Sequence, residues 1–153
     1  MPRNAFTLIE LTIVLLLLGV LAGVAAPKYA DAVAHFRVEA AARRIAADLK
    51  HARAQAMAAA AERKVVFDAA ADEYLLDGVV DLDHSSQIYR VSLADAEYLT
   101  DILEADFAGG SEVVFSHRGA ALAAGAVKLH SGGHTRSVEV SLPHSITIVN
   151  VND

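Results

Sequence analysis

Side chains capable of catalysis are present in this sequence, but their spacing fits no catalytic pattern. The chain has 7 histidines and no cysteine, which excludes both a thiol nucleophile and a cysteinyl zinc site. No histidine belongs to an HExxH pattern, no serine lies in a glycine-flanked nucleophile elbow, and no ATPase motif is present. We therefore expect a protein that is not an enzyme and that holds no cofactor.

Two short segments carry side chains that could bind a metal ion. Asp77, Asp81 and Asp83, in an expected loop, offer the carboxylate oxygens that calcium prefers. Their spacing matches no EF-hand and lacks its glycine, so a solvated acidic loop is the simpler interpretation. His130 and His134 bracket a Gly-Gly turn, where two solvated histidines are again simpler than a metal site. The prediction is no metal, with the three aspartates as the calcium candidates.

A single carboxylate interrupts the most apolar part of the chain. Glu10 lies near the start of residues 6–26, and positions 11–26 carry no charge. A helix of this length, at about 1.5 Å per residue, matches a hydrocarbon core of roughly 30 Å. Arg3 precedes the segment, so we expect the first residues in the cytoplasm and everything after Pro27 on the other side of the membrane. The sequence thus predicts a single-pass membrane helix.

A cleaved secretory signal peptide is the alternative interpretation of this segment. Small residues that suit a cleavage site stand at positions 22, 25 and 26. However, the apolar run is longer than a usual signal core, and a carboxylate central in the membrane costs about 2.5 to 3.5 kcal/mol. The alanine-rich helical pattern also continues past Pro27. We therefore favour a helix that the mature protein keeps.

Residues 5–12 (AFTLIELT), with the apolar run and Pro27 behind them, resemble the processing and assembly motif of type IV pilins and type II secretion pseudopilins. The resemblance implies that residues 1–5 are a leader. It further implies that a prepilin peptidase cuts between Ala5 and Phe6 and methylates the new amine of Phe6. That family strongly prefers glycine before the cut, whereas this chain has Ala5.

Cleavage at this bond would give Glu10 a physical role. The amine of Phe6 would be positive, and in a staggered array of parallel helices it can approach the Glu10 carboxylate of a neighbouring subunit. A paired charge is far less costly in a low dielectric than an unpaired one. Joining a filament would then relieve the cost of Glu10 and set the register of the helices. The alternative is that Glu10 simply extends toward the membrane interface.

Residues 27–62 are expected to continue the helix beyond the membrane. Positions 28–61 contain 15 alanines and no glycine or proline, and alanine is the strongest helix former. Pro27 lacks an amide donor and is expected to kink the helix where it leaves the membrane. One apolar stripe at spacings of three and four predicts a face that packs under a head: Val38, Ala41, Ile45, Leu49, Ala52 and Ala56.

The other faces of this helix are basic. The cations on them are Arg37, Arg43, Arg44, Lys50 and Arg53. A solvated or subunit-facing surface that offsets an acidic head is the simpler interpretation. Binding of DNA phosphates is the alternative, but no exposed aromatic residues are interleaved with these cations. Nucleic acid is therefore not an expected partner.

Two further segments are similar to the GspH/FimT group of minor pseudopilins. Residues 45–56 show that group's aspartate-leucine, alanine-arginine and alanine spacing, with the apolar residues 65–67 behind them. Residues 113–119 (VVFSHRG) resemble its apolar strand with a phenylalanine and a nearby glycine. The resemblance covers residues 5–67 and 112–149 and is negligible between them. It implies a pilin-like fold.

Residues 63–153 are expected to form a head dominated by antiparallel strands. Segments rich in β-branched and aromatic residues predict strands at 65–67, 74–80, 87–93, 112–116, 126–130, 137–142 and 145–151. Ser131 to Gly133 predicts a hairpin turn. Apolar residues at 98, 99, 102 and 103 predict a short amphipathic helix that starts near Ser92 and ends near Gly109. The expected fold class is α+β, a long N-terminal helix packed on an antiparallel β-rich head.

Length and charge agree with one head on a membrane helix. The 153 residues suffice for one ordinary domain. Hydrophobic residues make up 54% and the mean hydropathy is +0.35, so some apolar surface should meet a membrane or a partner. Residues 1–63 hold 8 basic and 5 acidic residues, and residues 64–153 hold 5 and 14. The net charge of −6 argues against broad binding of nucleic acid.

These features predict a structural minor subunit of a type II secretion pseudopilus that supports protein export. The resemblance implies as partners other pseudopilins or pilins, the prepilin peptidase, an inner-membrane assembly platform and the lipid bilayer. It implies a bacterial inner-membrane location with a cytoplasmic N-terminus and a periplasmic head. A minor type IV pilin in pilus assembly or DNA uptake is the first alternative. A membrane-tethered ligand- or calcium-binding module that never polymerises is the second.

Overall fold

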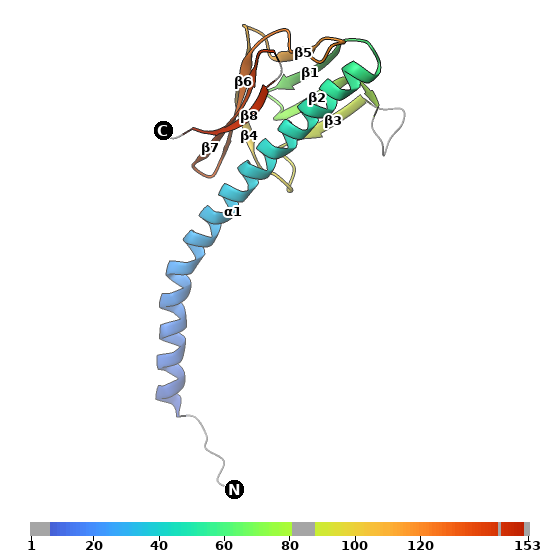
Figure 1. The fold of residues 1–153 in the computed structure, drawn as a ribbon. Coiled ribbons are helices and arrows are strands. Elements are labelled where there is room, and N and C mark those ends of the chain that lie inside the picture. The colour runs from blue at the N-terminus through green and yellow to red at the C-terminus, as the bar shows by residue number, and fades with distance from the viewer. Residues whose placement is uncertain (1–6, 81–87, 144, 152–153) are drawn as a thin grey trace. The chain divides into compact units, whose positions relative to one another are not determined.

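A computed structural model describes residues 7–80, 88–143 and 145–151 (Figure 1). The chain separates into two compact units, Met1–Val33 and Ala34–Asp153. One helix, α1 (Leu8–Ala58), supplies residues to both units, and eight strands follow it among the described residues. The two units differ in what they do with their apolar side chains.

The first unit is an apolar helix whose side chains are exposed. Its large apolar residues between Leu8 and Val24 are 45% to 81% exposed. The most apolar window of α1 has a mean hydropathy of 2.6, and the helix is long enough to cross a membrane. Removing such a surface from water is favourable by about 25 cal/mol per Å². The first unit is therefore built to meet lipid or other helices.

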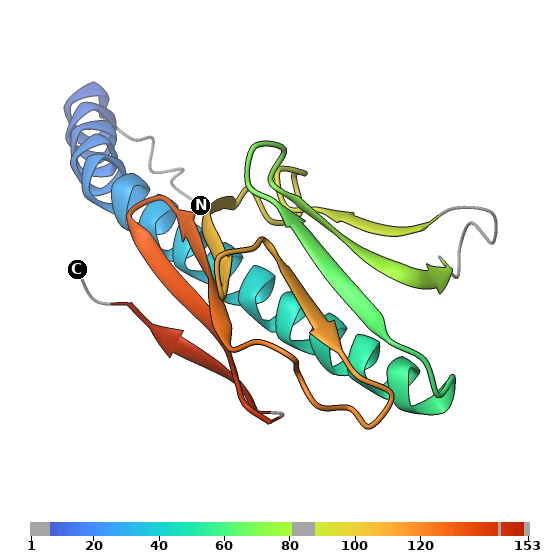
Figure 2. The same ribbon diagram turned by 90° about the horizontal axis from the view of Figure 1, so that it is seen from above.

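The second unit contains two antiparallel sheets beside the later part of α1. The first sheet has the order β3-β2-β1-β5 and consists of β1 (Arg63–Asp68), β2 (Glu73–Val80), β3 (Ile88–Ser92) and β5 (Glu112–Phe115). The second has the order β4-β6-β7-β8 and consists of β4 (Asp101–Phe107), β6 (Gly125–Ser131), β7 (His134–Ser141) and β8 (Ser145–Asn150). In Figure 2 the two sheets extend to opposite sides of this part of α1, and some strands of each cross in front of it.

A common core joins α1 to both sheets. The predicted apolar stripe is confirmed, because all six of its residues are fully buried: Val38, Ala41, Ile45, Leu49, Ala52 and Ala56. Three of them are alanine, whose small side chain lets the strands approach the helix closely. The core side chains opposite the stripe include Val65, Tyr74, Leu76 and Phe115 from the first sheet and Val127, Leu129 and Val138 from the second. The head thus folds around the helix.

All seven predicted strands are present, with ends that differ by three residues at most. The predicted turn at residues 131–133 joins β6 to β7. Gly132 and Gly133 have φ of 53° and 90°, and two consecutive left-handed residues are what a tight type I′ hairpin requires. A side chain at Gly132 would also lie 2.4 Å from the Cβ of Ala34. Glycine is therefore needed there for both backbone and packing.

The short amphipathic helix predicted between Ser92 and Gly109 is wrong. Only one turn forms, in which the amides of Tyr98 and Leu99 donate to the carbonyl of Asp95, and β4 follows it. The reason is a bulge in β4, where the register with β6 shifts between Ile102 and Glu104. One extra residue in a strand breaks its alternation. Of the four apolar residues behind the helix prediction, Tyr98 and Ile102 are buried four residues apart, as in a helix, whereas Leu99 and Leu103 are exposed.

Candidate assembly site

The beginning of α1 is capped by the residues of the N-terminal motif. Thr7 precedes the helix, its Oγ1 accepts a hydrogen bond from the amide of Glu10 at 3.2 Å, and its carbonyl accepts from the amide of Leu11. Thr7 is thus the N-cap and Glu10 the third helical residue, the T-x-x-E spacing of a capping box. The Glu10 carboxylate also lies at the positive end of the helix dipole. Sequence reasoning missed this cap, although its spacing was visible.

The structure does not bring the predicted assembly residues together within one chain. Glu10 is in the first turn of α1 and Pro27 is inside the same helix, about 26 Å farther along its axis at 1.5 Å per residue. Both are exposed. Ala5 and Phe6, the residues of the predicted cleavage, lie outside the described residues. Any partner of the Glu10 carboxylate on another subunit must therefore approach from outside this helix.

The calcium candidates are placed only in part. Asp77 lies in β2, opposite Lys64 of β1, so the expectation that it belongs to a loop is wrong. Asp81 and Asp83 lie outside the described residues. Among the residues that are described, no group of three His, Cys, Asp or Glu side chains could hold a metal ion. The part of the chain that the structure describes therefore gives calcium binding no support.

The histidines around the Gly-Gly turn have protein neighbours. His130 Nδ1 lies 3.4 Å from the hydroxyl of Thr135 on the paired strand. The ring of His134 packs edge-on against His35 of α1, with 5.2 Å between the ring centroids. These contacts fit a structural role for both histidines in the hairpin.

A buried carboxylate fastens α1 to the first sheet. Asp48 is 8% exposed and accepts hydrogen bonds from Tyr74 Oη at 2.6 Å and from Arg44 Nε at 3.0 Å. Tyr89 Oη approaches both oxygens at 3.3 Å and accepts a hydrogen bond from Arg44. The cluster of Asp48, Arg44, Tyr74 and Tyr89 therefore connects the helix to β2 and β3.

The charges in this cluster support one another. Burial, and then the nearby Asp48 carboxylate, raise the pKa of Tyr74 and of Tyr89. Burial opposes the charge of Arg44, but Asp48 more than compensates and raises the pKa of the guanidinium. Both tyrosines thus remain neutral next to Asp48. Asp48 lies on the buried side of α1, next to the apolar stripe. Because a buried acid needs hydrogen-bond partners, its position in the sequence could have indicated that it has them.

Replacing Asp48 by alanine is expected to lower the free energy of unfolding by about 3 kcal/mol, because it leaves Arg44 and the Tyr74 hydroxyl without their acceptor. Tyr74→Phe removes one donor and leaves the ion pair, so a loss of about 1 kcal/mol is expected. Chemical denaturation of the full chain in detergent, followed by tyrosine fluorescence, measures both. Equal losses in the two variants would contradict a central role for the carboxylate.

A second polar cluster fastens α1 to the second sheet. Glu39 accepts hydrogen bonds from Arg136 Nε of β7 at 3.0 Å and from Arg43 Nε at 2.9 Å. Arg136 also contacts His35 Nε2 at 2.9 Å. The hydrogen bond from Arg136 lowers the pKa of Glu39, burial opposes it, and Arg43 lowers it further. Glu39 is therefore more acidic than an ordinary glutamate.

This shift predicts a loss of stability in acid. A carboxyl whose pKa is lower in the folded state stabilises the fold above its ordinary value of 4.5, and that contribution disappears as the pH falls through the lower, folded value. At pH 7, Glu39→Gln is expected to cost about 1 kcal/mol. The difference from wild type should shrink below about pH 4.5 when unfolding is measured across pH. A difference that is constant with pH would contradict the ionic role.

The predicted basic face is partly neutralised within the chain. Arg43 and Arg44 each pair with an acid four residues away, Glu39 and Asp48. Lys50 is exposed and has no ion pair or hydrogen bond among the described residues. Arg43 and Arg44 thus belong to the two polar clusters that connect α1 to the sheets. This pairing favours the interpretation as a solvated or subunit-facing surface over a surface for DNA.

The long helix and the two antiparallel sheets together form a pilin-like fold. The crystal structure of the type IV minor pilin FimU from Pseudomonas aeruginosa is similar, with a TM-score of 0.52 and 12% sequence identity over 75% of this chain and 90% of that chain. At this identity the likeness concerns the fold alone. A search among curated proteins finds no match to the sequence.

Two family models match the chain. One, described as "Type II transport protein GspH", matches residues 41–143, and the other, described as "Prokaryotic N-terminal methylation motif", matches residues 1–26. Because the first match spans more than half of the sequence, the chain belongs to the GspH family. Members of this family are structural pilin-like subunits and not enzymes. The apolar helix and the methylation motif fit a membrane-anchored protein.

Proposed function

We propose that this chain is a minor subunit of a type II secretion pseudopilus and supports protein export through filament assembly. The observation that carries the proposal is the family match across residues 41–143, whose description is a type II transport protein. The exposed first part of α1 supports it physically. None of the large apolar side chains between Leu8 and Val24 is buried in the fold, so lipid or other subunits must cover them.

Processing would come first. A prepilin peptidase would remove residues 1–5 and methylate Phe6, as the match of residues 1–26 to the methylation motif supports. The mature chain would begin one residue before Thr7, which caps α1. The new amine would then lie beside the capped first turn, where Glu10 supplies a carboxylate. Arg3 would direct the leader to the cytoplasm, leaving the head in the periplasm.

Assembly would follow from the inner membrane. The subunit would wait there with the apolar first part of α1 in lipid until an assembly platform and its motor extract it. The chain contains no ATPase motif, so the energy for extraction must come from a partner. In the filament the Phe6 amine of one subunit would meet the Glu10 carboxylate of the next, which converts an unpaired charge in a low dielectric into a paired one.

Deletion of the gene in its own bacterium separates this function from the first alternative. We expect the deletion to remove secreted proteins from the culture medium while surface pili and DNA uptake remain, and a copy of the wild-type gene should restore secretion. Lost pili or lost DNA uptake with normal secretion would instead identify a minor type IV pilin.

The pilus alternative has one observation in its favour. The similar solved structure is named as a type IV minor pilin. That likeness is one of fold at 12% identity, whereas the family match comes from the sequence of this chain itself. The tethered calcium-binding module has no such support, since Asp77 lies in a strand and faces Lys64 across the ladder. Secretion is therefore the function we propose first.

A further inference from the structure

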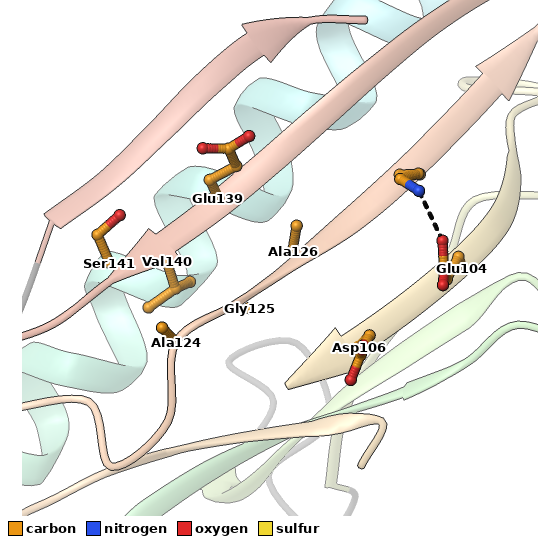
Figure 3. A pocket seen from close by; sticks show the side chains of 9 residues that line it. Glu104, Asp106, Ala124, Gly125, Ala126, Glu139, Val140 and Ser141 are labelled. Carbon is orange, nitrogen blue, oxygen red and sulfur yellow. Dashed lines mark hydrogen bonds and ion pairs between the residues drawn. The ribbon is translucent and has the colours of Figure 1, made fainter. Parts of the chain in front are cut away.

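The outer face of the second sheet, the side away from α1, is acidic. Val127, Leu129 and Val138 point into the core with α1, so their neighbours along each strand point outward. Figure 3 shows Glu139, Ala126 and Asp106 on this outer face. Asp101 and Glu104 of β4 are also exposed, and Lys128 of β6 forms an ion pair with Glu104 at 2.7 Å. The outward side chains named here thus comprise four carboxylates and one cation, Lys128.

Two of these carboxylates flank a floor of small residues. The register places Asp106 opposite Ala126, and Ala126 opposite Glu139. Neighbouring strands are about 4.8 Å apart, so the backbone positions of Asp106 and Glu139 lie about 10 Å from each other across the sheet. Between them is a hollow of about 400 Å³ whose floor includes Ala124, Gly125 and Ala126. Glu139 has no hydrogen bond or ion pair among the described residues.

The outer side of α1 carries the complementary pattern. Arg43, Ala47 and Lys50 are exposed, at spacings of four and three on one face of the helix. Seven residues at 1.5 Å each separate the two cations by about 10.5 Å along the axis. The side chain of Arg43 is 72% exposed even though its Nε binds Glu39, which leaves its terminal nitrogens available. The separation of the two cations on either side of Ala47 thus matches the separation of the two acids on either side of Ala126.

We propose that the outer face of α1 in one copy of this chain docks across the outer face of the second sheet in another copy. Arg43 and Lys50 meet Asp106 and Glu139, and Ala47 packs over Ala126. Small residues on both sides allow close approach, and opposite charges at matched spacing fix the register. Because the two surfaces differ, each copy in such a pair keeps one of the two surfaces free for a further subunit. The inference rests on the proposed function as a filament subunit.

Disulfide trapping in the full-length protein tests the contact. The chain has no cysteine, so Ala47→Cys in one tagged copy and Ala126→Cys in a differently tagged copy introduce the sole thiols and leave every charge in place. Both copies are expressed together and oxidised in the membrane. We expect about tenfold more mixed-tag disulfide than from the control pair Ala47→Cys and Ala70→Cys, in which the second residue is an exposed turn alanine.

Charge reversal separates this contact from random collision. Lys50→Glu in the copy with Ala47→Cys should lower the yield about fivefold or more, and Glu139→Lys in the other copy should restore it. Glu112→Lys on β5, which belongs to the first sheet, should not restore it. A mixed-tag yield at the control level, or one indifferent to Lys50→Glu, overturns the proposal.

A separate cysteine distinguishes the failure of this contact from the failure of assembly. Leu16 is 67% exposed in the membrane helix, and Leu16→Cys in both tagged copies reports contact between these helices. A disulfide at Leu16 without one between Ala47→Cys and Ala126→Cys overturns the docking contact and leaves the proposed assembly standing. Absence of both disulfides contradicts the docking contact and the assembly together.

Discussion

Replacing Glu10 by valine is expected to reduce recovery of the protein in sheared filaments by about tenfold or more, while its amount in the membrane stays equal or rises. The reason is electrostatic. A carboxylate in a low dielectric is costly unless it is paired, so Glu10 favours the filament, where the neighbouring amine is available. With valine the subunit no longer carries a costly carboxylate in the membrane, and in the filament it no longer forms the ion pair with the neighbouring amine. A loss of about 1.4 kcal/mol of assembly free energy already lowers the assembled fraction relative to the free subunit about tenfold.

The capped first turn supplies a matched control for this experiment. The amide of Glu10 donates to Thr7, and a glutamine at the third helical position supports a capping box as well as a glutamate does. Glu10→Gln therefore keeps the cap and removes the charge. We expect it to fail in filaments as the valine variant does. Normal incorporation of the glutamine variant would assign the role of this residue to capping and would contradict charge pairing.

Replacing Gly125 by alanine is expected to destabilise the head by about 3 kcal/mol and to lower its Tm by roughly 10 °C. A Cβ at this position would lie 2.1 Å from the carbonyl oxygen of Asp106 and 2.6 Å from both Cα and Cδ1 of Phe107. Two of these atoms belong to the backbone of β4, which pairs with β6 at this point. The strands would have to separate where Phe107 enters the core.

Gly110 provides the control for this substitution. It lies near the same end of β4, but a Cβ there meets only the carbonyl oxygen of Phe107, at an ordinary 3.8 Å. Gly110→Ala should change the free energy of unfolding by no more than about 0.5 kcal/mol. Thermal unfolding of the full chain in detergent, followed by circular dichroism, measures both variants. Similar midpoints for the two would contradict the close approach of β4 to Gly125.

The architecture was readable from the sequence where the physical pattern is local. The stripe from Val38 to Ala56 follows the period of a helix, and every residue in it is buried. The strands of the hairpin at Gly132 and Gly133 are defined by β-branched residues and a turn that needs left-handed backbone. Such signals span a few residues each, so no knowledge of distant contacts is needed.

Features that depend on distant partners were not readable in the same way. The bulge after Ile102 makes a strand resemble a helix, because the register with β6 decides it. The acceptor role of Asp48 depends on Tyr74 and Tyr89, which lie 26 and 41 residues farther along the chain. The sequence does place an acid among buried residues, which signals a partner. It does not say which strand supplies that partner.

The N-terminal site was predicted from a motif, and the same residues carry the signal for the helix cap. The spacing from Thr7 to Glu10 is a capping box that can be read directly. The partner of the Glu10 carboxylate would belong to another subunit and therefore cannot follow from contacts within one chain. The fold of one chain therefore shows that Glu10 is exposed at the start of the helix. Its pairing with a neighbouring amine can be tested only in assembled subunits.

The central claim is that the mature protein keeps its apolar helix and uses it to join other subunits. Intact mass and N-terminal sequencing of the protein purified from its own membranes test this claim most directly. We expect a chain that begins at a methylated Phe6 and retains Glu10. A mature protein that begins after Pro27 would have lost the helix, and the account would be wrong.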